Sequence, residues 1–88
     1  MKYRDMEQNI SVFNIKGETF IKIKTPYTYV FTGRKAEVWT VDKKYPVKLE
    51  YDEADPRNVT LTWTAGFSGQ FDLQYGEYKK TIVVESLF

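Results

Sequence analysis

The side chains of this chain that could do chemistry are carboxylates, Lys, Tyr, Ser and Thr, and four of the carboxylates lie in one short run. The run Glu50–Asp55 reads EYDEAD and contains Asp52, Glu53 and Asp55. Carboxylates can collect the many oxygen ligands that Ca²⁺ takes, and a pair of them can hydrolyse a glycoside. The spacing matches no calcium-binding loop, so we interpret the run as a solvated acidic loop.

Histidine and cysteine, which most often serve catalysis and metal binding near neutral pH, are both missing. The sequence has no His and no Cys among its 88 residues. The chain therefore offers neither the commonest general base nor a thiolate ligand, and no disulfide can form. We predict that the protein is not an enzyme and that it holds no cofactor and no metal ion.

Positive and negative charges nearly cancel over the whole chain. Thirteen Lys and Arg stand against twelve Asp and Glu, for a formal net charge of +1 at pH 7. This is not the balance of a polyanion-binding protein, and no apolar run approaches the length of a membrane span. We therefore expect neither nucleic acid nor a membrane as a partner. The first residues, MKYRDMEQNISVF, lack the apolar centre of a secretory signal. If Met1 is the native start, we expect the protein to be made in the cytoplasm and to stay there, or to leave inside an assembly or by lysis.

Alternation of apolar and polar residues recurs along the chain in short runs separated by turn residues. In the clearest run, Val59, Leu61 and Trp63 point one way and the intervening threonines point the other. Period-two runs predict β-strands, and no segment shows helical spacing over a useful length. The predicted strands are Asn9–Ile15, Thr19–Thr25, Tyr27–Phe31, Ala36–Asp42, Pro46–Tyr51, Val59–Thr64, Gln70–Tyr75 and Lys80–Phe88.

Seven or eight short strands at regular spacing favour an all-β, antiparallel sandwich, and the absence of Cys leaves it without a disulfide. We predict one sandwich domain over residues 9–88, preceded by an N-terminal arm, residues 1–8. Two Trp, six Phe and seven Tyr supply the buried area that so short a chain needs.

Four motifs, YTYVF, VWTV, VTLTW and SGQFDLQY, follow one another in this order. The order resembles the cysteine-poor immunoglobulin-like modules, close to PKD-like repeats, of tailed-phage virion proteins and bacterial surface proteins. The resemblance covers residues 18–88. It implies that Trp39 is buried, that Leu73 stands where the family has its second Cys, and that Tyr29, or less favourably Val30, lies opposite. Phe71 would replace a tyrosine, so the hydrogen bond of that tyrosine to the backbone is expected to be absent.

The resemblance implies a structural function. We expect an auxiliary or decoration component of a bacteriophage virion, located on the capsid surface and assembled in the host cytoplasm. It would dock on the major capsid protein or on another virion subunit. The alternative is an immunoglobulin-like module of an adhesin or glycan-binding protein on the bacterial cell surface, in which exposed tyrosines would bind glycans. A third reading is an intracellular interaction domain.

Docking is expected from the arm, from side chains near predicted turns and from the C-terminus. Chain ends are usually disordered unless something ties them down, so we expect a neighbouring subunit to order the arm. Aromatic residues and Arg are the commonest anchors of protein interfaces. The candidate docking residues are Lys2, Tyr3, Arg4, Arg34, Lys35, Tyr45, Tyr78 and Phe88.

Overall fold

The computed structural model describes residues 13–86, and this part of the chain is all-β. It contains no helix, and therefore none that could cross a membrane. The predicted fold class is confirmed. The strands are β1 (Ile15–Lys16), β2 (Phe20–Lys22), β3 (Pro26–Phe31), β4 (Trp39–Thr40), β5 (Val47–Tyr51), β6 (Asn58–Trp63), β7 (Gly69–Tyr75) and β8 (Tyr78–Glu85).

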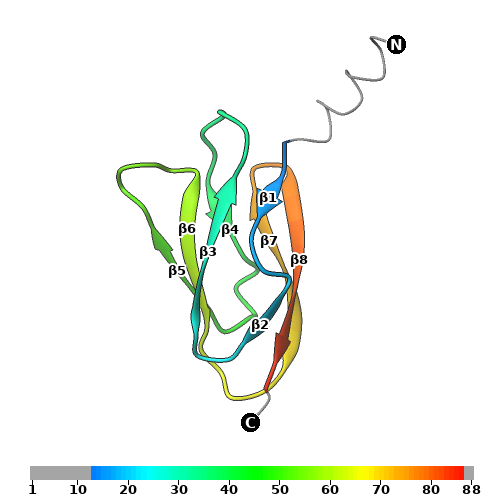
Figure 1. The fold of residues 1–88 in the computed structure, drawn as a ribbon. Coiled ribbons are helices and arrows are strands. Elements are labelled where there is room, and N and C mark those ends of the chain that lie inside the picture. Colours follow the sequence, from blue (N-terminus) through cyan, green and yellow to red (C-terminus); the bar gives the residue numbers. More distant parts are fainter. Residues whose placement is uncertain (1–12, 87–88) are drawn as a thin grey trace, which may run out of the picture.

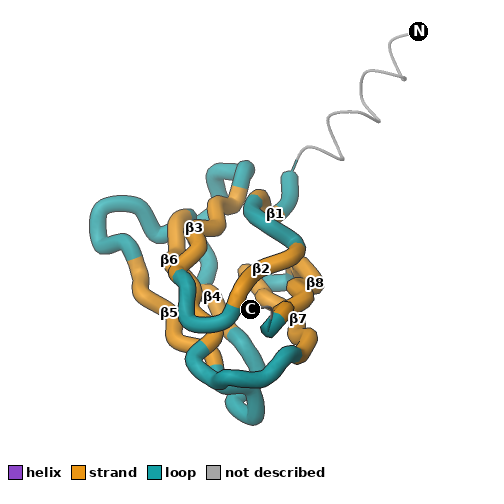
Figure 2. The backbone as a smooth tube through the Cα atoms, turned by 60° about the horizontal axis from the view of Figure 1, so that its bottom comes forward, coloured by secondary structure: helices purple, strands orange, loops and turns teal. Residues whose placement is uncertain are grey.

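The eight strands form two sheets that face each other (Figures 1 and 2). The order is β1-β3-β6-β5 in one sheet and β2-β8-β7-β4 in the other. If β1 and β2 are the two halves of a split first strand, this is the strand order of the immunoglobulin sandwich, in which strands A, B, E and D face strands C, F and G. The strand order therefore agrees with the predicted immunoglobulin-like sandwich of seven to eight strands.

One pair of strands departs from the predicted antiparallel arrangement. Strand β2 runs parallel to β8, with Phe20 opposite Val83, whereas every other pair in residues 13–86 is antiparallel. The chain passes from one sheet to the other between β1 and β2 (Figure 1). Strand β2 therefore pairs with β8 while it still runs in the direction of β1. The segment that connects β1 to β2 covers one side of the sandwich.

The first predicted strand is shorter than expected. Strand β1 begins at Ile15 and ends at Lys16, and the two residues before it, Phe13 and Asn14, are not in a strand. Asn9–Val12 lie outside the described residues. Strands β2 and β4, at the two edges of one sheet, are also shorter than the alternation predicted.

The core lies between the sheets and consists mostly of residues whose alternation predicted an inward direction, together with Ile82 and Val84 of the last strand. Trp39 and Leu73 are both buried, and Tyr29 faces the core whereas Val30 is exposed. The ring of Trp39 packs on that of Tyr75, with 4.5 Å between the ring centroids. The buried residues are Ile15, Ile21, Tyr29, Phe31, Trp39, Val59, Leu61, Trp63, Phe71, Leu73, Tyr75, Ile82 and Val84.

Two buried tyrosines use their hydroxyl groups to hold the loops at the ends of the core. Tyr75 Oη donates to the carbonyl oxygen of Lys35 at 2.7 Å and accepts the N–H of Glu37 at 2.9 Å. Tyr29 Oη donates to the carbonyl oxygen of Glu18 at 2.7 Å. Burial raises the pKa of the Tyr29 hydroxyl, because a phenolate would lose its hydration there. The Tyr29 hydroxyl therefore remains a donor at physiological pH.

Candidate functional site

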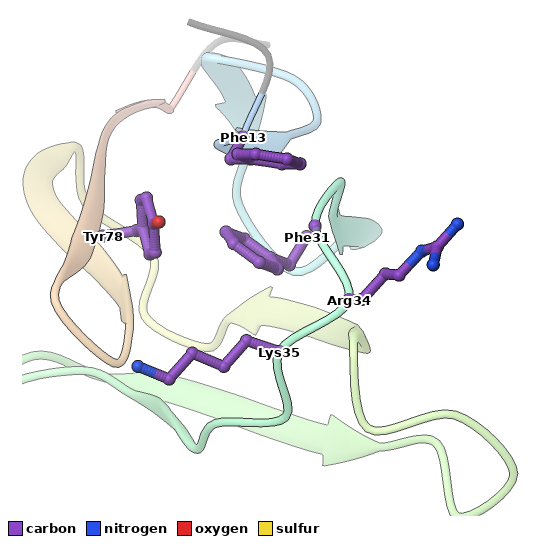
Figure 3. Close-up of a pocket in the computed structure, with 6 residues that line it drawn as sticks. Phe13, Phe31, Arg34, Lys35 and Tyr78 are labelled. Atoms are coloured by element: carbon purple, nitrogen blue, oxygen red, sulfur yellow. The ribbon is translucent and has the colours of Figure 1, made fainter. Parts of the chain in front are cut away.

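One end of the sandwich carries a pocket that brings together three of the candidate docking residues. The first described residues, the loop between β3 and β4 and the turn between β7 and β8 meet at this end, opposite the end of β8 (Figure 1). The pocket has a volume of about 200 Å³, and we call it the end pocket. It is lined by Phe13, Phe31, Gly33, Arg34, Lys35 and Tyr78 (Figure 3).

Three aromatic rings form the apolar part of the end pocket (Figure 3). Phe31 is buried, and its ring centroid lies 4.7 Å from that of the half-buried Tyr78. Phe13 stands above them with 49% of its surface exposed. Exposure of a Phe ring beside an open cavity leaves apolar surface in water, so an apolar group that enters the cavity would be stabilised.

Phe13 is held at the end pocket through its neighbour in the sequence. The N–H of Thr32 donates to the carbonyl oxygen of Asn14 at 3.0 Å, and the N–H of Asn14 donates to Thr32 Oγ1 at 3.0 Å. These bonds join the chain just before β1 to the residue just after β3. The position of the Phe13 ring therefore depends on the sheet rather than on the chain end alone.

Arg57 holds the loop that contributes Gly33 to the end pocket. Its Nη1 donates to the carbonyl oxygen of Gly33 at 3.0 Å, while its Nε and Nη2 donate to the two carboxylate oxygens of Asp55 at 3.1 and 3.0 Å. This two-point pair lowers the pKa of Asp55 and raises that of Arg57, since each group stabilises the charged form of the other. The loop that carries Arg34 and Lys35 is thereby fixed to the turn before β6.

Gly33 is required where the loop crosses over the rings. A Cβ atom at this position would lie 2.6 Å from Phe31 Cε2 and 3.2 Å from Phe13 Cδ1. Any larger residue would therefore have to push at least one ring aside. The glycine lets the backbone approach the rings closely and so shapes the end pocket.

The two cations at the rim of the end pocket differ in their pairing. Lys35 Nζ lies 3.0 Å from Glu37 Oε2, and this carboxylate raises the pKa of Lys35. Arg34 makes no ion pair with any residue between 13 and 86, and its guanidinium points away from the three rings (Figure 3). The rim therefore offers a positive charge, available to an incoming carboxylate, next to an apolar cavity.

Tyr45 lies away from the end pocket, in a second hollow. It lines a groove of about 370 Å³ together with residues of β5 and of the segment after β4. Its ring packs toward Trp63 and Phe71, with centroid distances of 6.4 and 6.0 Å. Tyr45 therefore covers the core as well as lining a surface. The other candidate docking residues, Lys2, Tyr3, Arg4 and Phe88, lie outside the described residues, as does the arm.

The sequence prediction missed two lining residues, Phe13 and Gly33. Phe13 was assigned to the first strand, and Gly33 to a turn without a further role. Arg34, Lys35 and Tyr78 were the sequence signals for this end of the molecule. They could not indicate which ring would stand beside them, because the lining residues come from three separate segments of the chain.

The acidic run is used by local hydrogen bonds. Asp52 Oδ1 accepts the N–H of Ala54 at 2.9 Å, and its Oδ2 accepts from the Asn58 side chain at 3.3 Å. Asp55 is engaged by Arg57. Within residues 13–86 no three side chains of the metal-binding types come together. That the loop binds no calcium remains a prediction.

Comparison of the chain with protein-family models, with curated proteins and with solved structures gave no match. The immunoglobulin-like topology therefore rests on the strand order, and the function has to be argued from the end pocket.

Proposed function

We propose that this protein is a non-enzymatic docking protein whose end pocket holds a side chain of a protein partner. The observation that carries the proposal is the convergence of three aromatic rings around an open cavity beside Arg34, which forms no ion pair within residues 13–86. The cavity, at about 200 Å³, is smaller than the roughly 300–1,000 Å³ of pockets that take drug-sized ligands. Its size suits one large side chain, and aromatic residues with Arg are the usual anchors of protein interfaces.

The setting that we propose is a tailed-phage virion. There the protein would act as an auxiliary or decoration component of the capsid surface, with the major capsid protein or another virion subunit as its partner. The order of the four sequence motifs supports this setting. Phe13, which lines the end pocket, follows the N-terminal arm closely in the chain. The arm and the end pocket can therefore engage the same neighbouring subunit.

A glycan-binding module of a bacterial surface protein is the second candidate, and the groove beside β5 favours it. Tyr51 in this groove exposes 58% of its surface, and Asp42 and Lys43 provide polar groups next to it. An exposed tyrosine ring can stack on the apolar face of a sugar. In this case Tyr51→Ala would abolish binding on a glycan array, and variants of the end pocket would not.

The test of the virion proposal is incorporation into particles. A producing strain that lacks the gene is complemented with the intact protein or with variants, and purified particles are analysed by mass spectrometry. We expect Arg34→Glu and Phe13→Ser to be largely lost from the particles. Lys43→Glu, which makes the same kind of charge change outside the end pocket, should be retained.

Normal incorporation of both pocket variants would refute the end pocket as the docking site. If the intact protein is absent from particles and binds glycans instead, the adhesin candidate replaces the virion proposal.

A further inference from the structure

We infer that the end pocket binds Met6 from the N-terminal arm of a second copy of this chain, with Asp5 and Glu7 placed at the Arg34 side of the rim. The inference rests on the proposed function in that both take the end pocket as a site for a protein side chain. It goes further because it names the occupant.

The end pocket defines what its occupant must carry. Phe13, Phe31 and Tyr78 provide aromatic faces and edges that suit a polarisable apolar side chain. Arg34 is without an acidic partner in residues 13–86 and points outward (Figure 3). The fitting segment therefore has an apolar side chain next to at least one carboxylate.

The twelve residues before Phe13 contain one sequence that meets both requirements. Met6 lies between Asp5 and Glu7. Thioether sulfur makes favourable contacts with aromatic rings, and carboxylates form short, strong hydrogen bonds with guanidinium. Because the carboxylates are adjacent to Met6 in the chain, they stay close to the rim whatever the local backbone conformation.

Charge also selects Met6 over the other apolar side chains of the segment. Tyr3 stands between Lys2 and Arg4, whose positive charges would be repelled by Arg34. Ile10 has the uncharged Asn9 and Ser11 at its sides and gains nothing from the rim.

The position of Phe13 favours a second copy over the same molecule. The first described residues run along the sandwich and away from its sheets (Figure 1), and the backbone of Asn14 is fixed on Thr32. A Met6 that entered its own end pocket would require the chain to reverse direction just before Phe13. Six residues lie between Met6 and Phe13, and the seven steps from one Cα to the other span up to about 23 Å when extended, enough to reach a copy that presents the same end. Two such copies exchange arms reciprocally, as in a two-fold symmetric dimer.

The first test is the mass of the full-length protein in solution. Sedimentation across a range of concentrations should show a dimer for the intact chain. Met6→Lys and Arg34→Glu should each weaken the dimer by about tenfold or more, since one buries a charge in the cavity and the other repels the carboxylates. Ile10→Lys is the matched control and should leave the dimer unchanged. Circular dichroism confirms that each variant is folded.

The second test is rescue. Combining Arg34→Glu with Asp5→Lys and Glu7→Lys reverses both sides of the contact and should restore the dimer. A mixture of the Met6→Lys and Arg34→Glu chains, each monomeric alone, should form a heterodimer, because one partner has an intact pocket and the other an intact arm.

The outcomes separate this inference from the proposed function. A monomeric intact chain, a dimer unaffected by Met6→Lys, or a failure of both rescue experiments would overturn arm exchange. If the dimer fails and Arg34→Glu is still lost from particles, the end pocket docks on another subunit and the proposed function stands. If the dimer forms as described and the protein is absent from particles, arm exchange stands and the virion setting falls.

Discussion

Replacement of Tyr75 by Phe removes one oxygen atom that connects the core to the loop of the end pocket. The hydroxyl donates to the carbonyl oxygen of Lys35 and accepts the N–H of Glu37, at 2.7 and 2.9 Å. The ring itself is fully buried between Trp39 and Phe31 and would remain in place as Phe. The substitution therefore isolates the two hydrogen bonds.

The magnitude follows from the number of bonds. Each net hydrogen bond contributes about 0.5–1.5 kcal/mol, so Tyr75→Phe should lower the free energy of unfolding by about 1–3 kcal/mol. A loss of about 2 kcal/mol corresponds to a fall of roughly 8–16 °C in melting temperature for a domain of this size. Tyr29→Phe removes one bond, to the carbonyl oxygen of Glu18, and should cost about half as much.

Urea denaturation followed by tryptophan fluorescence measures this series. Tyr45→Phe is the matched control, because the Tyr45 hydroxyl makes no hydrogen bond within residues 13–86, and its effect should stay below about 0.5 kcal/mol. Tyr75→Phe should also weaken binding at the end pocket, since the loop that carries Lys35 loses its anchor. Equal stability of the Tyr75→Phe and Tyr45→Phe variants would refute the assignment of the hydroxyl as the link between core and loop.

Three further predictions concern the core and the acidic run. Trp39→Ala should cost about 3–5 kcal/mol and leave little folded protein by circular dichroism, because the ring is buried; a variant that melts like the intact protein would contradict this. Arg57 lowers the pKa of Asp55, so this pair stabilises the fold above the ordinary carboxyl pKa of 3.8 and stops doing so as the pH falls through the lower folded value. Asp55→Asn should therefore lose less stability on acidification than the intact protein. If the free energy of unfolding of the two proteins fell in parallel with pH, the Asp55–Arg57 pair would not stabilise the fold. Replacing Ca²⁺ by a chelator should not move the melting temperature; a rise of several degrees in millimolar Ca²⁺ would reveal a site at Asp52, Glu53 and Asp55.

The alternation of apolar and polar residues predicted which face of most strands points to the core. A shift of one residue would turn every apolar side chain of a strand to solvent, so only one register buries them. Val59, Leu61 and Trp63 all face the core as the pattern required. The turn before β6 was also readable, since Asp and Pro favour its first two positions, and the N–H of Asn58 donates to the carbonyl oxygen of Asp55 at 3.1 Å.

The last strand could not be placed by the same argument. Ile82, Val83 and Val84 are consecutive apolar residues, so both faces of this strand are apolar and the pattern does not indicate which face is buried. Pairing with β7 decides the register, and it sets Ile82 opposite Phe71 with Val83 turned outward.

The end pocket was only partly predictable for a different reason. Arg34, Lys35 and Tyr78 were recognised as candidates because they stand near turns. Whether they share a site depends on which loops meet at one end of the sandwich, and no local pattern carries that information. The hydrogen bond from Tyr75, at the end of β7, to the carbonyl oxygen of Lys35 shows the same limit, because no local pattern indicated which loop this hydroxyl would meet.

The parallel pairing of β2 with β8 has a mechanical consequence. The described chain begins at one end of the sandwich and finishes at the other (Figure 1), and β2 and β8 run in the same direction between them. A pull that separates the two ends slides these strands along each other, so the hydrogen bonds between them are strained together rather than opened one at a time. In an atomic force experiment the domain should resist extension along this axis more strongly than a pull applied across the β7–β8 turn, which peels its strands apart bond by bond.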